Sequence, residues 1–508
     1  MPVPLSVTAN NASKTYGQAI SLASTAFSTS GLVNGETVTN VTLSSPGTLA
    51  SASIAGSPYA ITPSNAIGTL TPSNYVITYV NGSLSIQSTA LIVTANDASK
   101  NYGESLALPL TAFTTSGLIN GDTIVSVIET SPGTLATANV LGSPYTITPS
   151  GASGSFIPSN YTITYVDGKL TVLPVPLLIS ANNTSKNYGQ SISLLSNGFS
   201  TNGLVNGDTV DSVTQSSSGS VASANVLGSP YAITPSGATG SFAPSNYTLS
   251  YANGALTVLP IPLVVTANDA SKFYGQTPSL PLTAFTANGL VNGDTVVSVN
   301  QASLGTAASA NVIGSPYAIT PSGASGAFTA SNYILSYVNG ALMVLPAPLV
   351  VTANNASKNY GQTLTLPLTA FTSSGLVNGD TIVSVNESSP GTIASASIAG
   401  SPYVITPSGA IGSFTPSNYT ISYVNGLLTI QSIPLIITAN DQTKNYGQTL
   451  ILPLTAFTAS GLINGDTVTS VHESSTGTSA MANVIGSPYA IIPTDASGSF
   501  NASNYTIS

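Results

Sequence analysis

The sequence predicts an all-β protein made of six tandem copies of one small domain. Three observations predict this architecture. The same tyrosine-containing motifs return every 86 residues, as at Tyr16 and Tyr102. Short stretches rich in Val, Ile, Thr and Tyr alternate with Gly, Pro, Asn and Ser, which is typical of strands separated by turns. No stretch shows a sustained helical period with capping residues, so we expect at most short helical turns.

The dipeptide Tyr-Gly marks each repeat, and its spacing never changes. Its tyrosines are Tyr16, Tyr102, Tyr188, Tyr274, Tyr360 and Tyr446. Ser-Pro-Tyr, Ser-Asn-Tyr and a fourth tyrosine near the end of the repeat keep the same phase, and these series account for all 23 tyrosines. The predicted domains are residues 1–88, 89–174, 175–260, 261–346, 347–432 and the truncated 433–508. Because the first residues match a linker and the sixth repeat stops before its last turn and strand, we expect a longer array.

The second repeat illustrates the expected strands. Residues 91–96 and 145–148 are β-branched runs bounded by turn residues. Residues 111–127 predict a strand, a turn at Asn120-Gly121 and a second strand. Residues 160–172 predict a hairpin around Asp167-Gly168, because Asp-Gly suits a type I′ turn. This hairpin would place five side chains on one face, namely Tyr161, Ile163, Tyr165, Leu170 and Val172.

Successive repeats are joined by short sequences such as "VLPVP", "VLPIP" and "VLPAP". Proline restricts itself and the preceding residue to extended conformations, so these linkers are expected to be stiff. Six domains of about 30–35 Å each would form an elongated rod about 200 Å long. The first junction, "IQSTA", contains no proline and is predicted to bend most easily.

Three motifs in fixed order carry a family resemblance. "SKNYGQ", "GLVNGDT" and "NYTISYVNGLLTI" together resemble the MBG domain of the YGX type, found in tandem in large bacterial surface adhesins of filamentous-haemagglutinin-like style. The resemblance covers essentially the whole chain. It implies a mostly β module, β-grasp-like or Ig-like, in an exported protein at the bacterial cell surface or outside the cell. It also implies adhesion to a host glycan or surface protein through regions outside this sequence.

Composition excludes several classes of function. The chain has 7 Lys and no Arg, 16 acidic residues and a net charge of −9, which excludes a nucleic-acid or anionic-membrane binder. Its apolar runs are too short to span a membrane. It has no cysteine and one histidine, so thiol chemistry, most metal sites and most acid–base catalysis lack their residues. We therefore expect a non-enzymatic, monomeric protein without catalytic residues, cofactors or metal ligands.

The residues that recur at motif positions form a structural signature. In the first two repeats they are Lys14, Tyr16, Gly17, Lys100, Tyr102, Gly103, Asn120, Gly121, Asp122, Tyr145, Tyr161, Tyr165, Asp167 and Gly168. The lysine and the acid of each repeat lie 22 residues apart, as Lys14 and Glu36 do. They are expected to form a weak surface ion pair or no contact. The sharper alternative is a Lys–Asn isopeptide bond, which needs a buried lysine, an asparagine and a carboxylate together.

Calcium, catalysis by histidine and sugar binding are further alternatives. Ca²⁺ requires 6–8 oxygen ligands, and each repeat supplies few acids. One acid, Asp97, is replaced by Asn11 in the first repeat, so a charge is not needed there. His472 stands where other repeats have Thr, Ile or Asn, which indicates an exposed strand position. The tyrosines could form a sugar platform, but their alternating spacing favours core positions.

Two functions remain after these exclusions. The first is a stalk of β domains that projects a distal functional domain from a bacterial surface. The second is a multivalent module in which each repeat binds a glycan or host protein weakly. A binder should display an aromatic or polar cluster on each repeat, whereas a stalk should bury its tyrosines.

Overall fold

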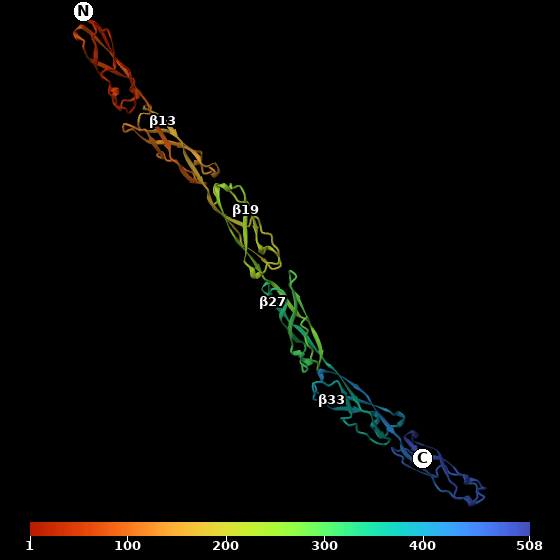
Figure 1. Cartoon of the computed structure of the whole chain (residues 1–508). Helices are drawn as coiled ribbons and strands as arrows, with labels where there is room; N and C mark the ends of the chain where they lie inside the picture. Colours follow the sequence, from red (N-terminus) through yellow and green to blue (C-terminus); the bar gives the residue numbers. More distant parts are fainter. The chain divides into compact units, whose positions relative to one another are not determined.

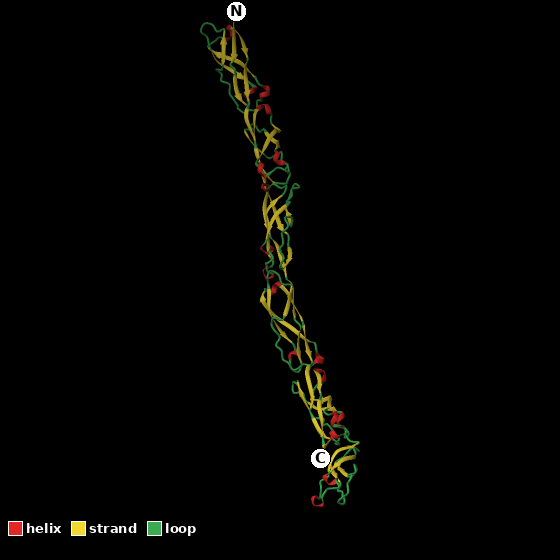
Figure 2. Ribbon diagram, turned by 90° about the vertical axis from the view of Figure 1, so that its right-hand side faces the viewer, coloured by secondary structure: helices red, strands yellow, loops and turns green.

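Strands dominate the computed structural model, which describes all 508 residues (Figure 2). The chain divides into two compact units, Met1–Leu259 and Pro260–Ser508, which contain repeats one to three and four to six. Its only helical elements are 3₁₀ turns of three residues, three in each repeat. None of these turns has the length or apolar character needed to cross a membrane. The predicted all-β class and the six tandem repeats are confirmed.

The second repeat contains seven strands, including β13, which is marked in Figure 1. In chain order they are β8 (Thr89–Ala95), β9 (Ala98–Asn101), β10 (Phe113–Ser116), β11 (Thr123–Thr130), β12 (Tyr145–Ser155), β13 (Tyr161–Val166) and β14 (Gly168–Leu173). The 3₁₀ turns are η4 (Pro132–Thr134), η5 (Val140–Gly142) and η6 (Pro158–Asn160). The strands that were expected at residues 91–96 and 145–148 are therefore present, within β8 and β12.

These strands form two sheets. One has the order β10–β8–β13, and the other has the order β11–β12–β14–β9. The central strand β8 is antiparallel to β10 and parallel to β13, whereas β14 is antiparallel to β12 and parallel to β9. The chain thus crosses between the sheets several times in one repeat. Because no α-helix covers either sheet, the arrangement is that of a β-sandwich, and the β-grasp alternative, which needs such a helix, does not describe it.

The predicted hairpin around Asp167-Gly168 is wrong. Its two strands lie in different sheets: Tyr165 of β13 pairs with Val93 in β8, and Leu170 of β14 pairs with Tyr145 in β12. Asp167-Gly168 is therefore a crossover between sheets. Gly168 is needed there because a Cβ atom would lie 2.7 Å from the carbonyl oxygen of Ala95, at the end of β8.

The turn at Asn120-Gly121 forms as predicted, but it also joins two sheets. Both residues have positive φ, 55° and 82°, and the amide of Asp122 donates to the carbonyl of Ile119 at 3.0 Å. The strands before and after this turn are β10 and β11, and they pair with β8 and β12 rather than with each other. Local turn chemistry was therefore right, and the assumed strand partners were not.

Alternation along the strands places the apolar side chains between the sheets. Leu91 and Val93 of β8, Ile147 of β12 and Leu170 of β14 are fully buried. Threonines at the intervening positions of β13 face solvent. Tyr165 departs from the predicted inward face, because 37% of its surface is exposed.

The other repeats of the first unit follow the same plan. In the first repeat the strands are β1 (Val3–Ala9), β2 (Ala12–Thr15), β3 (Phe27–Ser30), β4 (Val38–Ser44), β5 (Tyr59–Gly68), β6 (Tyr75–Val80) and β7 (Gly82–Gln87). In the third they are β15 (Val175–Ala181), β16 (Thr184–Asn187), β17 (Phe199–Asn202), β18 (Ser212–Ser216), β19 (Tyr231–Thr239), β20 (Tyr247–Ala252) and β21 (Gly254–Leu259). Only Pro174 separates β14 from β15, so the predicted linker is almost entirely strand.

The second unit repeats the plan with one incomplete copy. In the fourth repeat the strands are β22 (Ile261–Ala267), β23 (Ala270–Phe273), β24 (Phe285–Asn288), β25 (Thr295–Ala302), β26 (Tyr317–Ala327), β27 (Tyr333–Val338) and β28 (Gly340–Leu345). In the fifth they are β29 (Ala347–Ala353), β30 (Ala356–Asn359), β31 (Phe371–Ser374), β32 (Ile382–Ser388), β33 (Tyr403–Gly412), β34 (Tyr419–Val424) and β35 (Gly426–Gln431). The sixth has β36 (Ile433–Ala439), β37 (Phe457–Ser460), β38 (Val468–Ser474), β39 (Ile492–Gly498) and β40 (Tyr505–Ile507), and its second sheet is reduced to β38–β39.

Candidate functional site at the joint between repeats

The three sequence motifs meet where one repeat contacts the next. Within each unit, the Tyr-Gly end of a repeat packs against the Asn-Gly turn and the Ser-Asn-Tyr segment of the following repeat. We call this contact the joint. It is described for repeats one and two, two and three, four and five, and five and six.

One carboxylate at the joint accepts hydrogen bonds from two tyrosines. The hydroxyl of Tyr16 donates to Oδ2 of Asp122 in the next repeat at 3.1 Å, and Tyr161 donates to the same oxygen at 2.6 Å. The two rings pack edge to face with centroids 5.5 Å apart. The corresponding sets are Tyr102, Asp208 and Tyr247; Tyr274, Asp380 and Tyr419; and Tyr360, Asp466 and Tyr505. Hydrogen bonds to an ionised group are about twice as strong as neutral ones.

The environment keeps the second tyrosine protonated. Burial, together with the hydrogen bond to Asp122, raises the pKa of Tyr161 to about 12. Tyr247 and Tyr419 show the same shift to about 12 for the same reasons. The neutral hydroxyl therefore remains a donor to the carboxylate throughout the physiological pH range.

Two asparagines add polar contacts across the joint. Asn120 Nδ2 donates to the carbonyl of Ala50 in the preceding repeat at 3.0 Å. Asn160, which is 1% exposed, accepts hydrogen bonds from Ser53 Oγ and the Ile54 amide, both at 2.8 Å. Because a buried amide that lost these partners would be costly, Asn160 favours one arrangement of the two repeats.

The glycine of Tyr-Gly is required by conformation and by close approach. Gly17 has a φ of 87°, and a Cβ atom there would lie 2.0 Å from Cδ1 of Ile119 in the next repeat. At Gly103 the nearest atom would be Cγ2 of Val205, at 2.6 Å. The apolar residue before Asn-Gly thus packs directly onto the glycine of the preceding repeat.

The hydrophobic core continues through the joint. Tyr16 and Ile86 of the first repeat form one buried cluster with Leu91, Val93 and Tyr161 of the second. Equivalent clusters join repeats two and three, four and five, and five and six. Neighbouring repeats therefore share apolar interior in addition to polar contacts.

The signature lysines do not pair with the Asn-Gly acids. Lys14 and Lys100 are 3% and 5% exposed. Lys100 Nζ donates to the carbonyls of Glu104 and Leu135 at 2.7 and 2.6 Å, and Lys14 makes the equivalent contacts. Burial lowers the pKa of both ammonium groups. Of the two expected outcomes, an ion pair and no contact, the structure has no contact, because the lysine is inside its own repeat and the acid binds tyrosines at the joint.

The position shared by Asp97 and Asn11 fixes the crossover between sheets. Asp97 Oδ1 accepts from the amide of Lys169 at 2.7 Å, and Asn11 Oδ1 accepts from the amide of Ser83 at 2.8 Å. Only an acceptor oxygen is needed, which explains why Asn and Asp alternate there. No group of three His, Cys, Asp or Glu residues has the arrangement of a metal site.

The remaining signature tyrosines serve their own repeats. Tyr145 is half-buried and donates to the carbonyl of Asn139 at 3.0 Å. The Tyr165 hydroxyl accepts from the amide of Ala152 at 2.9 Å. His472 lies on an exposed position of β38, opposite Thr494, in agreement with its assignment from sequence.

The comparison with protein families agrees with the repeat pattern. The model of the MBG domain (YGX type) matches residues 5–85, 91–171, 177–257, 263–343, 349–429 and 435–508. The chain belongs to this MBG family. In MBG repeats of this chain, the Tyr-Gly pair that gives the type its name lies at the joint.

Known proteins similar to this MBG array include a bacterial relative. Internalin J of Listeria monocytogenes serotype 4b (strain F2365) is 28% identical over 371 residues, which cover 72% of this chain and 33% of that protein. Among solved structures, protocadherin gammaB7 EC3-6 matches at 11% identity and a TM-score of 0.20, covering 68% of this chain and 98% of that one. Drosophila N-cadherin EC1-4 matches at 8% identity and a TM-score of 0.15, covering 67% and 100%. Scores at this level do not establish a shared fold.

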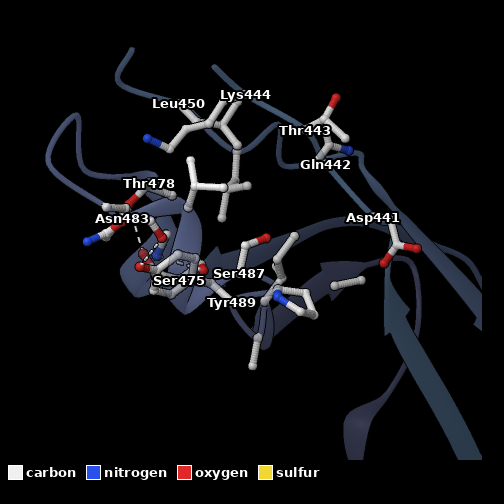
Figure 3. A pocket seen from close by; sticks show the side chains of 18 of the residues that line it. Asp441, Gln442, Thr443, Lys444, Leu450, Ser475, Thr478, Asn483, Ser487 and Tyr489 are labelled. Carbon is white, nitrogen blue, oxygen red and sulfur yellow. Dashed lines mark hydrogen bonds between the residues drawn. The ribbon is translucent and has the colours of Figure 1, made fainter. Parts of the chain in front are cut away.

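One large cavity, of about 830 Å³, lies in the sixth MBG repeat (Figure 3). Its lining includes Lys444, Leu450, Ser487 and Tyr489. In the fifth repeat the equivalent of Ser487, Ser401, accepts from the amide of Ile430 in β35. The cavity therefore occupies the place of the last strand of a complete repeat, and its polar groups are those that bind that strand.

Sequence reasoning missed several joint residues. It singled out Tyr16, Gly17, Asn120, Gly121 and Asp122 as recurrent, but it did not bring them together. It did not single out Asn160 or the apolar Ile119, although both belong to recurrent motifs. Their constancy could have indicated a role, but nothing in one repeat's sequence shows that their partners lie in its neighbour.

Proposed function

We propose that this MBG array is a non-enzymatic stalk region of a bacterial surface protein, which holds a distal functional domain away from the cell. The joint carries this proposal. A stalk must transmit position and force from one domain to the next, and a flexible string of domains would not do so. The joint supplies the apolar and polar contacts that resist bending.

The strength of the joint supports the proposal. An edge-to-face aromatic pair contributes about 0.5–1.5 kcal/mol beyond its buried area. Each hydrogen bond to a charged group contributes about 1.5–3 kcal/mol. Tyr16, Asp122 and Tyr161 combine one such ring pair with two such bonds. Additional contacts from Asn120 and Asn160 make independent motion of the two repeats costly.

The placement of the tyrosines favours a stalk over a multivalent binder. At each of the four described joints both tyrosines of the pair, such as Tyr16 and Tyr161, are buried. The most exposed tyrosine of the second repeat, Tyr165, uses its hydroxyl on its own backbone. The joints therefore use the aromatic residues that a sugar platform would need to display.

The relation to Internalin J, a bacterial surface protein, supports the location. The match covers a third of that protein. A distal domain and its partner are therefore part of the proposal.

Distance measurements across one joint test the stalk. Because the chain lacks cysteine, Thr78→Cys and Thr164→Cys place spin labels on equivalent exposed positions of β6 and β13 in the full chain. We expect a narrow distance distribution, which Asp122→Ala broadens because both tyrosines lose their acceptor. The matched control is Asp97→Ala, which lies away from the joint. A distribution already broad in the otherwise unchanged chain would refute the stalk.

A further inference from the structure

Each described joint contains a solvent-exposed Asn-Gly pair whose amide nitrogen binds the preceding repeat. Asn120, Asn206, Asn378 and Asn464 donate from Nδ2 to a carbonyl oxygen across the joint at 2.9–3.0 Å. The asparagine and its glycine are both exposed in all four cases. Asn34 has the same turn geometry, with φ of 57° followed by 73° at Gly35, but its side-chain amide makes no hydrogen bond to another repeat in this structure.

Asn-Gly is a chemically reactive pair. The backbone nitrogen of glycine can attack Cγ of the asparagine side chain, which forms a succinimide ring and releases ammonia. Water then opens the ring at either carbonyl, giving aspartate or isoaspartate. Glycine leaves this attack unhindered because it has no Cβ, and at Gly121 no heavy atom lies within 4 Å of the Cβ position. The reaction needs no reagent besides water.

We propose that the Asn-Gly turn of each joint is a site of spontaneous deamidation, and that this covalent change loosens the joint. The inference goes beyond the stalk function and does not require it. The cross-joint hydrogen bond restrains the side-chain amide in the intact joint. Opening of the joint frees the amide for attack, so reaction and opening reinforce each other.

The product disfavours the intact joint for electrostatic reasons. Deamidation of Asn120 replaces an N–H donor by a carboxylate that faces the carbonyl oxygen of Ala50, and two oxygens without a hydrogen repel. The new charge also lies two residues from Asp122, which already holds the negative charge of the joint. Isoaspartate would in addition lengthen the backbone of a turn whose two residues have positive φ.

The crossover Asn-Gly pairs provide an internal control. In the pair Asn81-Gly82, the glycine is buried, and its Cβ position lies 2.5 Å from the carbonyl oxygen of Ala9. The second repeat has Asp167 at this position, so the crossover accepts a carboxylate. The four joint positions described here all carry asparagine.

Peptide mapping of the incubated full chain tests where the reaction occurs. We expect Asn34 to deamidate about three- to tenfold faster than Asn120 in the folded chain. This factor corresponds to the free energy of one neutral hydrogen bond, which restrains the side chain of Asn120. Asn81 should react more slowly than Asn120. In urea the differences should vanish. Equal rates at Asn34 and Asn120 in the folded chain, or faster reaction at Asn81, would overturn the proposal.

The substitution Asn120→Asp tests the consequence in the full chain, and Asn81→Asp is its matched control. The spin-label distance between positions 78 and 164 should broaden in the first variant and stay unchanged in the second. Hydrogen exchange at the amide of Ile54, which is bonded to Asn160 across the joint, should rise several-fold only in the first. Unchanged distance and exchange in Asn120→Asp would show that deamidation leaves the joint closed. Either result is independent of whether the array serves as a stalk.

Discussion

One half-buried position, on strand β11 and on its counterparts in the other repeats, holds residues that differ in their capacity to donate hydrogen bonds. The position holds Leu43, Glu129, Gln215, Gln301, Glu387 and Glu473. Gln215 donates from Nε2 to the carbonyls of Leu195 and Gly198 at 2.7 and 3.0 Å, and Gln301 makes the equivalent pair of bonds. The carboxylate oxygens of Glu129 and Glu387 are buried without a hydrogen-bond partner. This position therefore suits a side chain that donates hydrogen bonds. An ionised carboxylate cannot donate one, so glutamate leaves the two carbonyls without a side-chain donor.

This difference predicts a pH-dependent stability of individual repeats. Burial raises the pKa of Glu129 and Glu387, and no charged neighbour contributes. When the pKa of a carboxyl group is higher in the folded state than in the unfolded state, the group stabilises the fold most below its unfolded pKa of about 4.3. That contribution to the free energy of unfolding is lost as the pH rises through the folded pKa. Glu129→Gln should therefore stabilise the second repeat by about 1 kcal/mol at pH 7 and by much less at pH 4.

Hydrogen exchange of the second repeat at the two pH values measures this effect, after correction for intrinsic exchange rates. Gln215→Glu is the reciprocal control and should destabilise the third repeat at pH 7 only. A pH-independent gain in Glu129→Gln would contradict the role assigned to protonation.

The buried lysines predict an order of chemical reactivity. Lys100 is enclosed and bonded to two carbonyls, whereas Lys169 is exposed on β14. An amine-acylating reagent should modify Lys169 in the native chain well before Lys14, Lys100, Lys186, Lys272 or Lys358. Mass spectrometry after brief labelling gives the order, and labelling in urea should make all sites equivalent. Early labelling of Lys100 would show that its enclosure opens readily.

Single residues were only partly predictable from the sequence. Alternation correctly placed Tyr161, Leu170 and Val172 inside, because strand geometry is local. The partners of Lys100 and Asp122 could not be predicted, because Lys100 is held by loop carbonyls and Asp122 by two tyrosines, one of which lies in another repeat. Spacing between charges invites a pair, but it does not reveal which groups the fold places between them.

Among the elements, the crossover at Asp167-Gly168 shows where pattern reasoning fails. Asp-Gly between alternating segments is the usual indication of a hairpin. Here the two strands instead find parallel partners, β8 and β9, that lie about 70 residues earlier in the chain. Strand positions follow from local composition, whereas sheet order depends on which long-range pairings bury the most apolar surface. The strands were therefore predictable and the topology was not.

The glycine of the crossover and the glycine of the joint turn should tolerate substitution by alanine to different degrees. Gly168→Ala places a methyl group 2.7 Å from the Ala95 carbonyl oxygen. This oxygen belongs to the backbone of β8, which cannot shift without a cost in free energy. Overpacking of this kind costs about 1–3 kcal/mol or more. Gly121→Ala meets no neighbouring atom and should cost about 1–2 kcal/mol from its positive φ alone. Denaturant unfolding with local exchange readout should rank Gly168→Ala as the more damaging change, and the reverse order would refute the close-approach argument.

At the scale of the molecule, an incomplete repeat should be the weakest part of the chain. The sixth repeat has two strands in its second sheet where complete repeats have four, and Tyr446 is 70% exposed where Tyr360 is 5% exposed. Its second sheet therefore has fewer strand partners than that of repeat five. Hydrogen exchange should show lower protection in repeat six than in repeat five. Equal protection in the two repeats would mean that the missing strand contributes little.

Stiff joints also predict the length of the full chain in solution. If each joint resists bending, the dimensions of successive repeats should add, as they do in proteins whose repeats contact only their neighbours. Six domains of about 30–35 Å would then give a maximum dimension of about 200 Å in small-angle scattering. A flexible string would instead grow roughly as the square root of the repeat number.

Joint variants make this measurement decisive. Replacing Asp122, Asp208, Asp380 and Asp466 by alanine removes the shared acceptor from four joints while each repeat keeps its own sheets. The maximum dimension should fall in this variant and remain unchanged when Asp97 and Asp269, which serve the crossovers, are replaced by asparagine. The first junction, which lacks proline and is held by the Tyr16–Asp122 bond in the unsubstituted chain, should lose the most rigidity when Asp122 is replaced. Three domains of about 30–35 Å already give about 100 Å when the two joints within one unit are stiff, so an unsubstituted chain clearly shorter than about 100 Å would contradict stiffness at the joints.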